Sequence, residues 1–169
     1  EIYDKNGTVS VECVWFKTVN NGGITFNEHG GLNRAFCAVG DYVYISGRES
    51  NSSTAAAYLR KINGATGAVV GDIKLGAEAS VGLYPCNDVI KDQSGNVCIT
   101  NLTLDAKTTP LKVHKVNLSN GALTEVASLT VTSTIPNVEK ARIDHAALWG
   151  DVAKGDFTVY AAISSSASV

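Results

Sequence analysis

Three residues of complementary chemistry recur at nearly constant spacing along the chain. Arg34, Asp88 and His145 are separated by 54 and 57 residues. Each follows a short polar residue: Asn33, Asn87 or Asp144. A guanidinium, a carboxylate and an imidazole that converge can orient a polar or anionic ligand. The same groups can instead pair with one another and with loop backbone, as buried charges must. The sequence therefore predicts a ligand-binding position at these three residues and leaves a purely structural role open.

No motif in the sequence predicts catalysis. A nucleophile elbow, an HExxH zinc helix, a phosphate loop and a dinucleotide fingerprint are all missing. Asp144-His145 could be half of an acid/base pair, but neighbouring residues of a strand point to opposite faces. His114 aligns with Arg60 in the repeat described below, so we expect it at an exposed polar position. We predict no catalytic residue, no metal ligand and no cofactor.

The four cysteines carry no metal-binding pattern. They stand at positions 13, 37, 86 and 98, and no two of them form a CxxC pair. Cysteine is among the most buried residue types, which favours buried free thiols on strands. An even number of cysteines also allows two disulfides in an oxidising compartment. Both arrangements are open at this point.

The composition favours an all-β protein and excludes several partners. The 169 residues carry a net charge of −2 and only 18% charged side chains, with no basic run, so a nucleic-acid partner is not expected. No apolar stretch of about 20 residues is present to span a bilayer as a helix. Short β-branched runs separated by Gly and Asn are typical of strands joined by tight turns.

A repeat of 54 residues organises the chain. Three pairs of segments align at this offset: 42–46 with 96–100, 59–63 with 113–117, and 67–69 with 121–123. The strands of the first unit are expected at 34–39, 42–47, 57–63 and 68–75, and those of the second at 87–91, 96–102, 111–117 and 122–130. A third copy supplies two strands only, near 144–148 and 157–163. The repeat predicts successive antiparallel sheets of the same design.

Four antiparallel strands in roughly 50 residues are the unit of a β-propeller blade. We therefore predict a partial propeller of about two and a half blades, with a β-sandwich as the alternative. The expected divisions are 1–31, an N-terminal strand and Gly/Asn-rich loop; 32–81, blade 1; 82–140, blade 2; and 141–169, a partial blade 3. Propellers close with four to eight blades, so we expect further blades beyond this sequence or a partner on the open sheet edges.

Several short motifs resemble one bacterial family. They are Leu32 to Phe36, Tyr42 to Arg48, Asn63 to Gly67, Asn87 to Val89 and Val97 to Leu102. Together they resemble an uncharacterised propeller-like family of secreted and surface lipoproteins from Bacteroides-type bacteria. The resemblance covers residues 32–163 and implies an outer-membrane surface location, lipid-anchored or secreted, often beside nutrient-uptake machinery. It implies no catalytic residue.

Two classes of function follow from these observations. The first is a non-catalytic cell-surface accessory or binding module of an outer-membrane nutrient-uptake complex. Its expected partners are an outer-membrane transporter or other surface lipoproteins, with an oligosaccharide or a peptide as ligand. The second is a secreted hydrolase whose active site lies on blades outside this sequence. No pair of carboxylates is predicted across the ends of the blades, which favours the first class.

Overall fold

The computed structural model describes residues 12–17, 33–50, 52, 55–77, 84–132 and 140–165. This part of the chain contains twelve β-strands and no α-helix, which confirms the prediction of an all-β protein. No helix within these ranges is long and apolar enough to cross a membrane. The strands form two four-stranded antiparallel sheets and two short two-stranded ones.

The first sheet is an antiparallel meander in the order β1-β2-β3-β4. Its strands are β1 (Phe36–Val39), β2 (Tyr42–Arg48), β3 (Ala57–Asn63) and β4 (Val69–Lys74). The tight turn between β1 and β2 requires a left-handed residue, and Gly40 supplies it with a φ of 56°. All four strands lie within the expected ranges to within two residues at either end.

The second sheet repeats this design in the order β5-β6-β7-β8. Its strands are β5 (Asp88–Lys91), β6 (Val97–Thr100), β7 (Leu111–Val116) and β8 (Leu123–Leu129). A third unit consists of the hairpin β10 (Ala146–Asp151) and β11 (Asp156–Ala161). The sequence predicted four, four and two strands, and the structure contains them.

The 54-residue repeat extends to the hydrogen bonds of the two equivalent hairpin turns. Gly67 N–H donates to Asn63 O at 2.8 Å, and Gly121 N–H donates to Asn117 O at the same distance. Both glycines are left-handed, with φ of 69° and 75°. Each asparagine also accepts backbone N–H donors on its side-chain oxygen. The Asn and Gly positions of the repeat are thus explained by one turn geometry.

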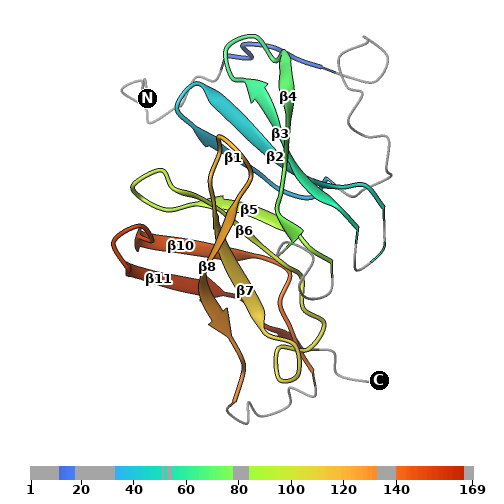
Figure 1. Ribbon diagram of the computed structural model, residues 1–169, viewed down its shortest axis with the longest axis vertical. Coiled ribbons are helices and arrows are strands. Elements are labelled where there is room, and N and C mark those ends of the chain that lie inside the picture. Colours follow the sequence, from blue (N-terminus) through green and yellow to red (C-terminus); the bar gives the residue numbers. More distant parts are fainter. Residues whose placement is uncertain are drawn as a thin grey trace, which may run out of the picture.

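The sheets stack face to face, as Figure 1 shows, with β5–β8 between β1–β4 and the β10–β11 hairpin. The interface of the first two sheets is apolar and includes Tyr44, Leu59, Val89, Val97 and Ile99. The interface of the second sheet with the hairpin includes Cys98, Val113, Leu148 and Val159. Each sheet therefore buries a face that it could not bury alone. Among the described residues, the sheets do not close into a ring.

Two features depart from the sequence prediction. The strand expected in residues 1–31 is described only at 12–17, and these residues belong to no strand. Instead, Trp15 crosses the β3–β4 turn and donates Nε1–H to Gly64 O at 2.7 Å. The structure also adds a small pair that the sequence did not predict, β9 (Ala141–Arg142) with β12 (Ser164–Ser165), because two-residue strands have no readable periodicity.

The expectation that His114 is exposed is wrong. Its relative exposure is 6%, because β7 belongs to a sheet that other elements cover on both faces. Its Nε2 lies 3.8 Å from Glu125 Oε2, which also accepts from Lys112 Nζ at 2.6 Å. The aligned residue Arg60 pairs with Asp72 on the next strand at 2.7 Å. The repeat thus places a basic side chain opposite an acidic one on the next strand in both sheets.

Candidate functional site

The three residues singled out in the sequence lie at equivalent strand ends. Arg34 stands two residues before β1, Asp88 opens β5, and His145 immediately precedes β10. The strands β1, β5 and β10 are the first strands of the three units, and β5 contacts both of the others. The repeat therefore brings Arg34, Asp88 and His145 to the same end of three neighbouring strands.

Asp88 is the centre of this arrangement. It is buried, and its Oδ2 lies 3.3 Å from His145 Nδ1 and accepts the N–H of Ala146 at 3.1 Å. The side chain of His145 is 61% exposed, so it presents the imidazole to solvent while one ring nitrogen faces the carboxylate. Asp88 thereby links the second unit to the third.

Arg34 joins the group through Asn87. Arg34 Nη1 donates to Asn87 Oδ1 at 3.0 Å, and Asn87 Nδ2 donates to the carbonyl oxygen of Asp144 at 2.7 Å. Asn87 is almost completely buried, so both ends of its amide are satisfied across unit boundaries. One chain of hydrogen bonds therefore crosses all three units, from Arg34 through Asn87 to the residue before His145.

Asp144 does not pair with its neighbour His145. Its carboxylate accepts from Arg142 Nε and Nη2 at 2.8 and 2.7 Å. This hydrogen bonding lowers the pKa of Asp144 despite its partial burial, and the same contact raises the pKa of Arg142. The two residues use different partners, but not for the reason predicted from the sequence, because both lie between β9 and β10 and not on a strand.

An open groove runs along the same three strands. It encloses about 440 Å³ and is lined by residues of all three: Phe36 to Ala38, Asp88 to Lys91 and Ala146 to Leu148. Lys91 Nζ crosses from β5 to the carbonyl oxygen of Ala38 at 2.8 Å. Phe36 is 72% exposed although it is aromatic. The groove combines apolar side chains with polar groups, and the buried residue Asp88 is part of its lining.

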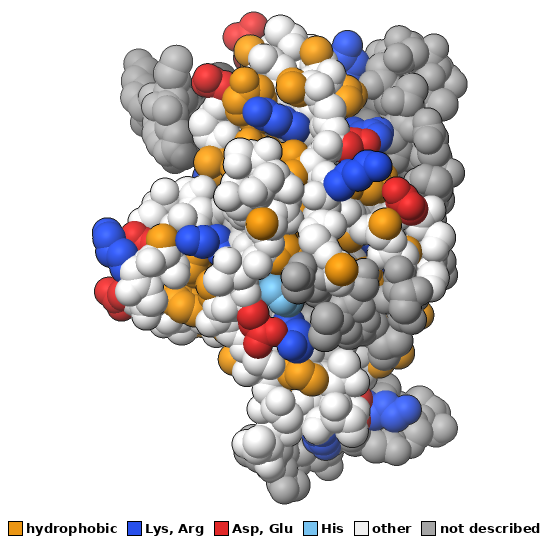
Figure 2. Space-filling view, in the orientation of Figure 1, with side chains coloured by type: hydrophobic (Ala, Val, Ile, Leu, Met, Phe, Trp, Pro, Cys, Tyr) orange, Lys and Arg blue, Asp and Glu red, His pale blue; other side chains and the backbone are white. Residues whose placement is uncertain are grey.

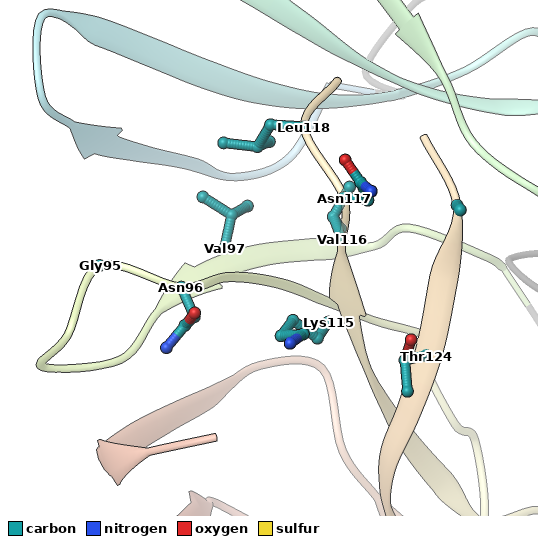
Figure 3. Close-up of a pocket in the computed structure, with 9 residues that line it drawn as sticks. Gly95, Asn96, Val97, Lys115, Val116, Asn117, Leu118 and Thr124 are labelled. Atoms are coloured by element: carbon teal, nitrogen blue, oxygen red, sulfur yellow. The ribbon is translucent and has the colours of Figure 1, made fainter. Parts of the chain in front are cut away.

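A second hollow lies at the opposite end of the second sheet. Figure 3 shows Val97 and Leu118 pointing toward the first sheet, while Lys115 is its only charged residue. Asn117 also borders this hollow, but its side-chain oxygen is already engaged in the turn after β7. This hollow brings no acid or imidazole together with Lys115, so it is the weaker candidate.

Sequence reasoning missed Arg48 as a candidate. It is the last residue of β2 and is 2% exposed, and its guanidinium lies 5.2 Å from the centre of the Tyr84 ring. Arg34, with which it interacts electrostatically, stands at the same end of the first sheet. The sequence shows an Arg at the end of an apolar strand, but it does not show that this side chain is buried.

The remaining reactive groups do not form a site in the described part of the chain. Cys37, Cys86 and Cys98 are buried free thiols, and Cys13 is free and exposed. Burial raises the pKa of Cys37 to about 11 and that of Cys86 and Cys98 to about 12. No group of three metal-ligating side chains occurs within the described ranges. Acidic and basic side chains alternate on the face in Figure 2, without a large patch of one sign.

Comparison with protein-family models, curated proteins and solved structures finds no significant match for this chain.

Proposed function

We propose that this protein is a non-catalytic binding module built from β-propeller blades, with its ligand site around Arg34, Asp88 and His145. The observation that carries the proposal is the meeting of these residues at one end of β1, β5 and β10. A groove lined by the same strands includes Asp88. Concave surfaces with a few convergent polar groups are the usual setting of ligand sites.

The order of the sheets supports propeller blades over a sandwich. Each full unit is a four-stranded meander whose first strand contacts the first strand of the next unit. A sandwich has two sheets, whereas here a third unit packs on the far face of the second sheet. The outer face of the third unit carries Trp149 and Tyr160, which are 61% and 58% exposed. A further sheet of the same kind would cover these aromatic rings and continue the stack.

Binding is tested with the purified full chain and two matched variants. We expect the wild type to bind at least one member of a panel of oligosaccharides and short peptides in calorimetry. Asp88→Asn should weaken that binding at least tenfold, because it removes the charge that faces His145. Asp72→Asn changes the same group on exposed β4 and should leave binding unchanged. If the wild type binds nothing, or both variants behave alike, the proposed site is wrong.

The alternative is a secreted hydrolase, and the same panel separates it from a binding module. A module returns every oligosaccharide and peptide intact after long incubation, whereas a hydrolase releases smaller products. No arrangement in the described residues favours hydrolysis, so we expect intact ligands.

The proposed place of action is the bacterial cell surface, beside an outer-membrane nutrient transporter or other surface lipoproteins. The family resemblance of residues 32–163 is its support. Protease treatment of intact cells that express the natural gene should remove the protein, and crosslinking should recover a transporter with it. Full protection from protease in intact cells would contradict this location.

A further inference from the structure

Arg48 is a buried cation whose donors are incompletely used. Its relative exposure is 2%, and neither Nε nor Nη1 has a hydrogen-bond partner in the described structure. A buried charge without a partner is strongly destabilising, because the lost hydration is not replaced. A residue of this kind at a strand end requires an explanation beyond packing.

The surroundings of Arg48 add positive charge. Burial lowers the pKa of Arg48, and Arg34 lowers it further, while Cys86 and Tyr84 oppose the shift. Among the described residues, no carboxylate forms an ion pair with Arg48 or Arg34. The nearby Asp144 is occupied by Arg142, and Asp88 faces His145. Within the described ranges, the two guanidinium groups at this end of the sheets therefore make no direct ion pair, and Arg34 acts on the carboxylate of Asp144 only through its charge.

Asn33, which the strand register places across from Arg48, carries an unpaired acceptor. Asn33 donates Nδ2–H to Ser46 O at 3.0 Å, but its buried Oδ1 has no hydrogen-bond partner. The antiparallel register of β1 and β2 continues through Ala35 and Ser46, which sets Asn33 across from Arg48. An anionic group alone cannot satisfy Oδ1, because this atom accepts hydrogen bonds. A hydroxyl next to an oxyanion can satisfy both.

The backbone of residues 84–86, whose Tyr84 ring faces Arg48, is strained. Tyr84 and Cys86, on either side of Pro85, have φ of 56° and 50°, a region that residues other than glycine rarely adopt. Such conformations are energetically unfavourable and cluster at ligand sites. Here they set the Tyr84 ring against the guanidinium of Arg48.

We propose that Arg48 and Arg34 bind the oxyanion of a small hydroxylated ligand, with a carboxylate sugar as the best fit and Asn33 Oδ1 as acceptor for its hydroxyl. This inference rests on the proposed function, because Arg34 and Arg48 lie at the same strand ends as the proposed ligand site. Charge-assisted hydrogen bonds from two arginines to a carboxylate are strong and geometrically selective.

The test uses glucuronate, glucose, acetate and sulfate at constant ionic strength, with binding measured by calorimetry on the full chain. We expect glucuronate to bind at least tenfold more tightly than glucose and acetate. If sulfate binds more tightly than glucuronate, the ligand of this site is a free inorganic anion. In that case the arginine variants should weaken sulfate binding as they would weaken glucuronate binding. Absence of binding of both glucuronate and sulfate to the wild type would overturn the proposal.

Variants separate a ligand role of Arg48 from a structural one. Arg48→Met should reduce glucuronate affinity at least tenfold and leave Tm without ligand unchanged or higher, because it removes a buried unpaired charge. Arg34→Met should weaken binding severalfold, and Arg60→Met, which removes an equal charge on β3, should not. A lower Tm for Arg48→Met with unchanged glucuronate affinity would mean that Arg48 is structural.

Two outcomes distinguish this inference from the proposed function. If the oligosaccharide and peptide panel gives a ligand that depends on Asp88, but glucuronate binds Arg48→Met as tightly as the wild type, the oxyanion site is wrong and the proposed module stands. If the oligosaccharide and peptide panel fails while glucuronate still binds through Arg48, the proposed module is wrong and the oxyanion site stands.

Discussion

His145 Nδ1 lies 3.3 Å from Asp88 Oδ2, although the two residues are 57 positions apart and stand at the starts of strands in different sheets. The same oxygen accepts the N–H of Ala146, so one buried carboxylate holds the start of β10 against the start of β5. The contact joins two units of the repeat at the end where Arg34 completes the group.

Removal of the Asp88 carboxylate should destabilise the protein more than removal of the imidazole. Asp88→Ala leaves the Ala146 N–H without its acceptor in a buried setting, at a cost of about 1–3 kcal/mol. His145→Gln changes a largely exposed group, and exposed ion pairs contribute about 0–1 kcal/mol. Urea unfolding measures both values. Equal losses would show that the imidazole, and not the backbone hydrogen bond, holds the two strands together.

The folded protein should lose stability in acid because the carboxylates of Asp92 and Asp144 become protonated. Burial opposes the ionisation of Asp92, but hydrogen bonds from Val152 N–H, Asn96 and Ser94 N–H outweigh it and lower its pKa. A carboxyl with a lowered folded pKa stabilises the fold above its unfolded pKa of about 4 and loses that contribution as pH falls through the folded value. The same sign applies to Asp144.

We therefore expect Tm to be flat from about pH 6 to 8 and to decline below about pH 4. Asp92→Asn should lower Tm at neutral pH and flatten the acid decline. Thermal scans over this range check both. A variant curve parallel to the wild type would show that Asp92 ionisation is not linked to folding.

Two glycines of similar backbone conformation should respond differently to substitution. Gly121 and Gly155 have φ of 75° and 74°. A Cβ on Gly121 would collide with the carbonyl oxygen of Lys74 on β4, whereas a Cβ on Gly155 meets open space. Gly155→Ala should cost only the left-handed strain of about 1–2 kcal/mol.

Gly121→Ala should cost at least 1 kcal/mol more than Gly155→Ala, since overpacking adds about 1–3 kcal/mol. Chemical unfolding of both variants gives the difference. Equal losses would mean that the β7–β8 turn does not approach the end of β4 so closely.

Thiol labelling should distinguish one cysteine from the other three. Burial raises the pKa of Cys37, Cys86 and Cys98 to about 11 or 12, so neither the thiolate nor access is available at neutral pH. A thiol reagent at pH 7.5 should modify only Cys13 in the folded protein and all four cysteines in denaturant. Fewer than four reactive thiols after unfolding without reductant would reveal a disulfide.

The strand pattern and the repeat could be predicted from the sequence. The β-branched runs between Gly40-Asp41, Asn63-Gly64 and Ser94-Gly95 mark strands because turn residues and period-two burial are local properties. The offset of 54 then predicted that Arg34 and Asp88 occupy equivalent places in neighbouring units. Local chemistry repeated in the sequence was enough for both conclusions.

Only the tertiary structure decided which of these residues are buried and what they touch. His114 and Arg60 align in sequence, yet the sheet that carries His114 has neighbours on both faces and so buries it. Arg48, at the end of β2, is also buried, and its missing hydrogen-bond partners become apparent only in the tertiary structure. Burial depends on contacts between residues far apart in the chain, whereas strand periodicity depends on neighbours, and this difference separates what the sequence determined from what the fold added.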